Sequence, residues 1–87
     1  MIVIDPPAVE RYGRRWSHLA SDLSYDELHV FARERGIPER GFDRDHYDVP
    51  SEYYDDMVAA GAVPVTSREL VALLVRAGLR RRKREPL

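Results

Sequence analysis

The chain contains no cysteine among its 87 residues. Disulfides, thiolate metal sites and cysteine nucleophiles are therefore excluded. Since small secreted domains usually depend on disulfides, we expect a reducing compartment and predict a cytoplasmic protein. The N-terminus lacks the basic segment and the long apolar run of a signal peptide. No apolar stretch approaches the roughly 20 residues that a membrane span needs, so no membrane association is predicted.

The length fits one domain with a thin core. A chain of this size buries only roughly 60–65% of its unfolded surface, so any ligand site is expected in a surface cleft. The formal charge of −1 is unevenly distributed, because residues 80–84 are all basic while residues 1–78 carry nine basic and fourteen acidic side chains. We predict a single α/β domain over residues 1–79, followed by a basic, disordered tail over residues 80–87.

Three helices are predicted from capping signals and glycine stops. Ser24 and Glu27 form a capping box ahead of the first helix, and Thr66 and Glu69 form another ahead of the third. Ser51 is expected to cap the second helix. The helices are predicted to end at three glycines, which are Gly36, Gly61 and Gly78.

Three short strands are predicted around residues 2–4, 46–49 and 62–65, each bounded or interrupted by proline. Residues 8–23 are ambiguous between a short strand and an ordered loop. Since strands alternate with helices along the chain, parallel pairing with right-handed crossovers is expected. The predicted fold class is therefore α/β, a small two-layer or three-layer domain with a short, mostly parallel sheet of two or three strands and three helices.

The segment 43–48 is the most polar part of the chain and holds three carboxylates, an imidazole, a phenol and a guanidinium. In open parallel sheets, ligands collect beyond the carboxyl ends of the strands. Asp5 directly follows the first predicted strand, so we expect it to approach His46 or Asp48 at the same edge. His18 and Arg14 lie in the segment between them, and we expect them to join this polar cluster.

Two chemistries suit the cluster. The first is a divalent metal site, because imidazole and carboxylate groups are suitable ligands. The candidate metal ligands are Asp5, His18, His46 and Asp48. The second is acid–base catalysis near neutral pH, for which the candidate catalytic residues are His18, His46 and Asp48. Arg14 would bind a phosphate or carboxylate bidentately, and Tyr47 is the other candidate ligand-binding residue. The expected function is binding or hydrolysis of a phosphorylated or otherwise anionic small molecule.

Each of these residues also has a purely structural interpretation. Their spacing matches no compact motif such as H-E-x-x-H, and no glycine-rich phosphate loop is present. His46 and Asp48 would then be a buried pair that fixes a strand end, and Tyr47 would be a core aromatic. Asp5 would be a turn residue before two prolines, and His18 would bond a backbone carbonyl.

The alternative function is a non-catalytic interaction module that binds protein or nucleic acid. The candidate nucleic-acid contacts are Arg80, Arg81, Arg82, Lys83 and Arg84. A block of like charges is typical of disordered segments that bind polyanions. The same block also fits a solvated terminus after a helix, where cations favour the helix dipole. The acidic remainder of the chain would repel a phosphate backbone.

Five segments carry a resemblance to a known family, namely Ile2–Pro7, Trp16–Asp22, Glu27–His29, Asp45–Val49 and Gly61–Val65. In this order they resemble a family of short bacterial and phage proteins that is catalogued only as a domain of unknown function. The sequences W-S-H-L and H-Y-D-V are the most specific parts, and the resemblance extends over roughly residues 2 to 81. It implies a stand-alone chain with the basic tail outside the shared core. It implies no activity and no site residues.

Overall fold

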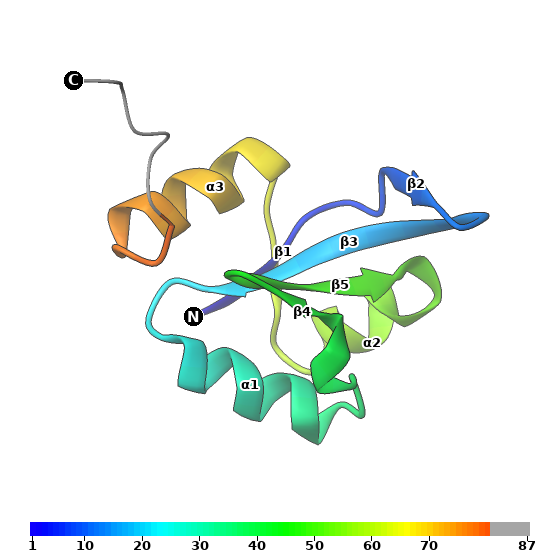
Figure 1. Cartoon of the computed structure of the whole chain (residues 1–87), viewed down its shortest axis with the longest axis horizontal. Coiled ribbons are helices and arrows are strands. Elements are labelled where there is room, and N and C mark those ends of the chain that lie inside the picture. The colour runs from blue at the N-terminus through cyan, green and yellow to red at the C-terminus, as the bar shows by residue number, and fades with distance from the viewer. Residues whose placement is uncertain (81–87) are drawn as a thin grey trace.

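A computed structural model describes residues 1–80, and it has one sheet with helices on both faces (Figure 1). The strands are β1 (Ile2–Ile4), β2 (Val9–Arg11), β3 (Arg14–Ser21), β4 (Phe42–Asp43), β5 (His46–Pro50) and β6 (Val63–Pro64). The helices are α1 (Tyr25–Glu34), α2 (Tyr54–Ala59) and α3 (Ser67–Arg76), with 3-10 turns η1 (Glu39–Gly41) and η2 (Ser51–Tyr53). Of the disordered tail predicted over residues 80–87, only Arg80 is described, and residues 81–87, including the candidate contacts at 81–84, lie outside the described residues.

The sheet is mixed and mostly antiparallel, so the prediction of a short, mostly parallel sheet of two or three strands was wrong. Its strand order is β4-β5-β3-β1-β6, with β2 paired to β3. Only β1 and β6 pair in parallel, whereas β3 is antiparallel to both β1 and β5. The expected three helices are present. Helix α1 connects β3 to β4, but these strands are not neighbours, because β5 lies between them and pairs antiparallel with both.

The physical reason for this difference lies in the segment that the sequence left ambiguous. It forms a hairpin of β2 and β3, which turns at Tyr12 and Gly13 with φ angles of 56° and 71°. Two residues at positive φ are the geometry of a tight hairpin turn whose twist matches its strands. The long strand β3 then lies between β1 and β5, so the two strands expected to be neighbours are kept apart.

Alternation along the central strands gives the sheet one strongly apolar face. Leu19 of β3 and Tyr47 and Val49 of β5 are buried on this face, against Leu28 of α1 and Met57 of α2. Figure 1 shows α1 and α2 together on this side of the sheet and α3 on the other side. Residues two apart on a strand share a face, so the intervening residues of β3 and β5 point toward the α3 side.

The core on the α3 side is smaller. Leu70 and Leu74 of α3 pack onto Val3 of β1 and Ala20 of β3. The next residue of β3 on this face is His18, which is only partly buried. Helix α3 therefore covers one end of this face, and polar side chains occupy the part beside it.

The helix boundaries test the capping predictions. The capping box of Thr66 and Glu69 is present, with both reciprocal hydrogen bonds. Ser24 accepts from the Glu27 amide, but the Glu27 carboxylate bonds Ser21 and the N-terminal amine, so that capping box is only half formed. The prediction that Ser51 caps the second helix was wrong, because η2 comes first and α2 begins without a side-chain cap. The expected glycines follow the three helices at positive φ, namely Gly36, Gly61 and Gly78.

Among the described residues, no helix is both long enough and apolar enough to cross a membrane.

Candidate functional site

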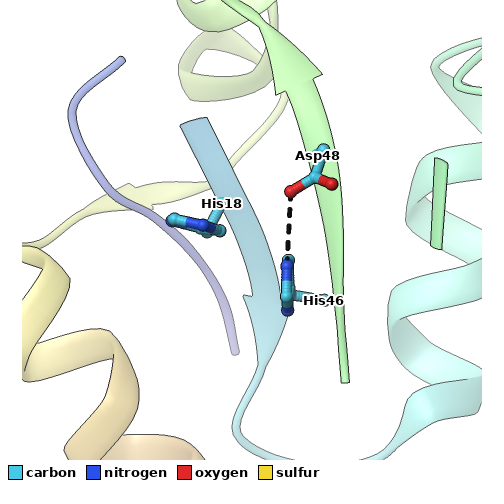
Figure 2. A group of neighbouring side chains, drawn as sticks. All are labelled: His18, His46 and Asp48. Atoms are coloured by element: carbon cyan, nitrogen blue, oxygen red, sulfur yellow. Dashed lines mark ion pairs between the residues drawn. The ribbon is translucent and has the colours of Figure 1, made fainter. Parts of the chain in front are cut away.

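Strand pairing brings the polar residues of β3 and β5 together. His18 lies directly opposite Asp48 in the antiparallel register. His46 precedes Asp48 by two residues, so it projects from the same face of β5. The rings of His18 and His46 meet edge to face, with centroids 4.8 Å apart and planes inclined by 78°. Figure 2 shows the three side chains converging from the two neighbouring strands.

His18 is held from behind by Asp5, which follows β1 and is only 1% exposed. Nδ1 of His18 lies 2.8 Å from Oδ2 of Asp5, and the His18 amide donates to Oδ1 at 2.6 Å. The hydroxyl of Ser67, in the first turn of α3, donates to Oδ2 at 2.7 Å. With both oxygens of Asp5 engaged, the carboxylate supports the imidazole and does not reach the His46–Asp48 side of the ring, where the sequence predicts it.

Both members of this pair have a shifted pKa. Burial by itself would raise the pKa of Asp5, but hydrogen bonds from the His18 ring, the His18 amide and Ser67 outweigh it, so the pKa lies below its usual range. The hydrogen bond to Asp5 is the main reason that the pKa of His18 is raised. Burial opposes this rise, whereas the charges of Asp5 and Asp48 support it.

His46 has a similar arrangement with Asp45, which is only 6% exposed. Nδ1 of His46 lies 2.8 Å from Oδ1 of Asp45. The guanidinium of Arg80 donates two hydrogen bonds to the same carboxylate, from Nε to Oδ2 at 2.7 Å and from Nη2 to Oδ1 at 3.0 Å. Burial would raise the pKa of Asp45, but the hydrogen bonds from Arg80 and His46 lower it, and the bond to Asp45 raises the pKa of Arg80.

The two carboxylates fix which ring nitrogens face the cluster. When Nδ1 of a neutral histidine donates to a carboxylate, Nε2 carries the free lone pair. Nε2 of His46 lies 3.3 Å from Oδ1 of Asp48. One possible ligand atom from each of His18, His46 and Asp48 lies within 4.8 Å of the other two. A lone pair and a carboxylate at this distance repel one another unless a proton or a cation lies between them.

A pocket of about 250 Å³ opens in front of these three residues. Its outer wall is formed by the β2–β3 hairpin, which contributes Arg11, Tyr12 and Trp16. The indole of Trp16 is fixed by a 2.9 Å hydrogen bond to the Arg11 carbonyl. The cluster is therefore accessible from solvent and has aromatic and cationic neighbours on one side.

Two of the predicted site residues lie elsewhere. Arg14 stands farther along β3, where its guanidinium lies 5.8 Å from the Trp16 ring centroid and 3.1 Å from Glu52. Tyr47 points to the opposite, apolar face, and its hydroxyl lies 2.6 Å from Nδ1 of His29. Its contacts there match the structural interpretation of a core aromatic with a satisfied hydroxyl. The structure thus brings together His18, His46 and Asp48, with Asp5 behind them.

Sequence reasoning missed three supporting residues, namely Ser67, Asp45 and Arg80. Asp45 belongs to the polar segment 43–48, and its position next to His46 was the available signal for a role. Arg80 was predicted to be a nucleic-acid contact in the basic tail, but its guanidinium is engaged by Asp45. No local pattern in the sequence indicates that residue 80 meets residue 45.

Comparison with known proteins identifies a family for the chain. The family described as Protein of unknown function (DUF4031) matches residues 2–77, so the chain belongs to this family, as the resemblance of its segments indicated. No curated protein matches the chain, and no solved structure matches it.

Proposed function

We propose that this DUF4031 protein binds a divalent transition-metal ion through Nε2 of His18, Nε2 of His46 and a carboxylate oxygen of Asp48. The observation that supports this proposal is the pair of buried carboxylates behind the two rings. Metal-ligating histidines almost always donate their second ring nitrogen to a carboxylate, a carbonyl or water, which fixes the tautomer and increases the basicity of the ligand. Asp5 and Asp45 are in the right positions for this role.

The distances between the ligand atoms are compatible with such an ion. Nitrogen and oxygen ligands about 2.0–2.2 Å from a metal lie about 3.0–3.5 Å from one another in tetrahedral or octahedral geometry. The separation of His46 and Asp48 is already 3.3 Å. With all three atoms within 4.8 Å of one another, a displacement of at most about 1–2 Å by the His18 side chain completes the site.

The ligand types favour zinc, manganese or iron(II) over magnesium and calcium, which prefer sets made only of oxygen. Three protein ligands leave at least one position facing the pocket, as in catalytic metal sites. A metal ion in such a position lowers the pKa of bound water and polarises a phosphoryl or carbonyl oxygen. We therefore assign the site to the binding or hydrolysis of a phosphorylated or otherwise anionic substrate.

Isothermal titration of the metal-free protein with Zn²⁺ and Mn²⁺ tests the metal site. We expect one ion per chain, and His18→Ala or His46→Ala should weaken binding by at least about 100-fold, the upper range for loss of a mere supporting residue. The matched control is His29→Ala, which removes the third histidine on the opposite face. Its metal affinity should equal that of the wild type, with circular dichroism used to verify folding. No binding of either ion by the wild type, or equal losses in all three variants, would refute the proposal.

The second candidate is a non-catalytic module whose polar cluster is structural. It is favoured by the bonds that Asp5 and Asp45 make to Ser67 and Arg80, because these fasten the C-terminal part of the chain to the sheet. In that case removing His46 would lower stability in the metal-free protein, and added metal would leave the thermal midpoint unchanged. A metal-binding site instead predicts that saturating Zn²⁺ raises the midpoint of the wild type but not of His46→Ala.

A further inference from the structure

The β2–β3 hairpin is the most exposed part of the sheet. All three residues of β2 are exposed, and the turn lies at one extreme of the molecule, beyond the helices (Figure 1). Tyr12 occupies the turn at a positive φ of 56° and is 85% exposed. Glycine, asparagine and aspartate are the residues that favour this conformation. A solvated tyrosine at this position contributes no buried contact to the fold, so folding does not account for its presence.

Three arginines surround this tyrosine. Arg11 and Arg14 flank the turn and face one another in the hairpin register, and Arg15 follows. Arg14 and Arg15 make exposed ion pairs with Glu52 and Glu10, which contribute little to stability and are readily exchanged. Within residues 1–80, Arg11 makes no ion pair. The hairpin is thus a cationic projection on a domain whose first 78 residues are acidic overall.

The hairpin lines the same pocket as the cluster of His18, His46 and Asp48. Tyr12 and Trp16 line the same pocket as His18, and Arg11 lines it with them. The pocket of about 250 Å³ is smaller than the roughly 300–1,000 Å³ typical of small-molecule sites. A ligand that uses both the cluster and the exposed tip must therefore extend along the hairpin outside the pocket.

We propose that the anionic substrate of this site is a single-stranded nucleic acid, bound along the β2–β3 hairpin with one phosphate at the cluster. Arg11 and Arg14, which share the face of Trp16 and His18, contact phosphates, while Tyr12 and Trp16 offer ring faces to unpaired bases. Cationic grooves with aromatic platforms are the usual means of binding single strands. A duplex keeps its bases stacked and would leave the Tyr12 ring unused. This substrate class rests on the proposed function, but binding by the hairpin does not require the metal.

Fluorescence anisotropy with a labelled oligonucleotide of about 12 unpaired nucleotides, in EDTA, measures this binding directly. Tyr12→Asn is the decisive variant, because asparagine suits the turn conformation and keeps the hairpin while removing the ring. Loss of one stacked base should weaken binding by about 5-fold to 150-fold. Replacing Arg11 and Arg14 together by glutamine should lower the slope of log affinity against log salt by about 1.4, or about 0.7 per phosphate contact.

A control variant separates binding at the hairpin from binding at a different surface of the chain. The double glutamine variant of Arg33 and Arg35 removes equal charge from the C-terminal end of α1 and its C-cap, and it should leave both the affinity and the salt slope unchanged. Because the strand titration is carried out in EDTA, a failed metal titration and a failed strand titration are distinct results. Binding that is unaffected by Tyr12→Asn and by loss of Arg11 and Arg14 overturns the proposal. Equal affinity for a duplex or for polyglutamate also overturns it.

Discussion

The same two strands, β3 and β5, place apolar side chains on one face of the sheet and polar side chains on the other. On the α1–α2 side, β3 and β5 bury Leu19, Tyr47 and Val49 in a continuous apolar core. On the α3 side, the alternating residues of these strands include His18, His46 and Asp48. The apolar face supplies most of the favourable burial, so the other face tolerates groups whose burial contributes little to folding.

Those groups are expensive to bury unless they are fully bonded. A carboxylate removed from water loses several kcal/mol of solvation, and hydrogen bonds and opposite charge must offset this loss. Asp5 accepts three hydrogen bonds and Asp45 accepts three, with Arg80 supplying a full charge. Removing a partner of either carboxylate on the polar face therefore leaves a buried charge with too few hydrogen bonds. The apolar face, in contrast, stabilises the fold by burying apolar side chains and does not depend on these bonds.

The largest expected loss of stability is on the apolar face. Leu28→Ala removes a fully buried side chain of α1 and should lower the free energy of unfolding by about 2–5 kcal/mol. Because Leu28 and the cluster lie on opposite faces, the zinc affinity of the folded variant should remain within about threefold of the wild type. Urea denaturation and isothermal titration measure the two quantities. A tenfold loss of zinc affinity in folded Leu28→Ala would show that the faces are coupled.

A smaller loss, with a distinctive pH dependence, is expected from Asp5→Asn. Asparagine cannot accept at both positions, so the metal-free variant should lose about 1.5–3 kcal/mol near pH 6. The pKa of Asp5 is lowered, so its contribution is complete above about pH 4 and disappears as the pH falls through the folded value. The pKa of His18 is raised, so its contribution is complete below about pH 6.5 and disappears as the pH rises through the folded value.

Because the pKa of Asp5 is lowered and that of His18 is raised, the stabilisation that this pair gives the metal-free wild type is constant between about pH 4 and pH 6.5 and falls on either side. Asp5→Asn should lower the plateau and make both limbs shallower in urea denaturation carried out with EDTA. The acid limb should persist in part, because the pKa of Asp45 is also lowered by Arg80 and His46. A variant that keeps the alkaline limb of the wild type would show that Asp5 is not the cause of the raised His18 pKa.

The two faces were not equally predictable from the sequence. Local signals identified the helices and the alternation of β5, because caps, glycine stops and a period of two are encoded over a few residues. The position of β3 was not predictable, since residues 14–21 begin with two arginines and contain only two consecutive apolar residues, Leu19 and Ala20. The antiparallel insertion of β3 between β1 and β5 depends on the turn at Tyr12, where the required positive φ is carried by an atypical residue.

The members of the candidate site were predicted from residue types, and its geometry was not. The sequence grouped Asp5, His18, His46 and Asp48 because imidazoles and carboxylates are suitable metal ligands and lie near the predicted strand ends. It could not assign the roles of Asp5 and Asp45, because a carboxylate that supports a histidine and one that faces a ligand are the same residue type. The contacts of Asp5 with Ser67 and of Asp45 with Arg80 span 62 and 35 residues, distances over which no local pattern operates.

The smallest expected change in the free energy of unfolding comes from comparing two serines of β3, one whose hydroxyl is hydrogen-bonded and one whose hydroxyl is not. Ser17 and Ser21 both lie on β3 and are buried, but the Ser17 hydroxyl has no hydrogen-bond partner among the described residues, whereas Ser21 bonds Glu27 and two amides. A buried hydroxyl without a partner loses its hydrogen bonds to water, and no hydrogen bond within the protein compensates for that loss. Ser17→Ala should therefore leave the free energy of unfolding unchanged or raise it by up to about 1 kcal/mol.

The matched variant Ser21→Ala should lower the free energy of unfolding by about 1–3 kcal/mol, because the Leu23 and Ser24 amides and the Glu27 carboxylate lose their partner. Urea denaturation of the two variants side by side, at one pH and salt concentration, gives the comparison. Equal losses would mean that Ser17 has a bonding partner in solution. Since the strand, the substitution and the degree of burial are shared, the difference between the variants measures what hydrogen bonding contributes on this sheet.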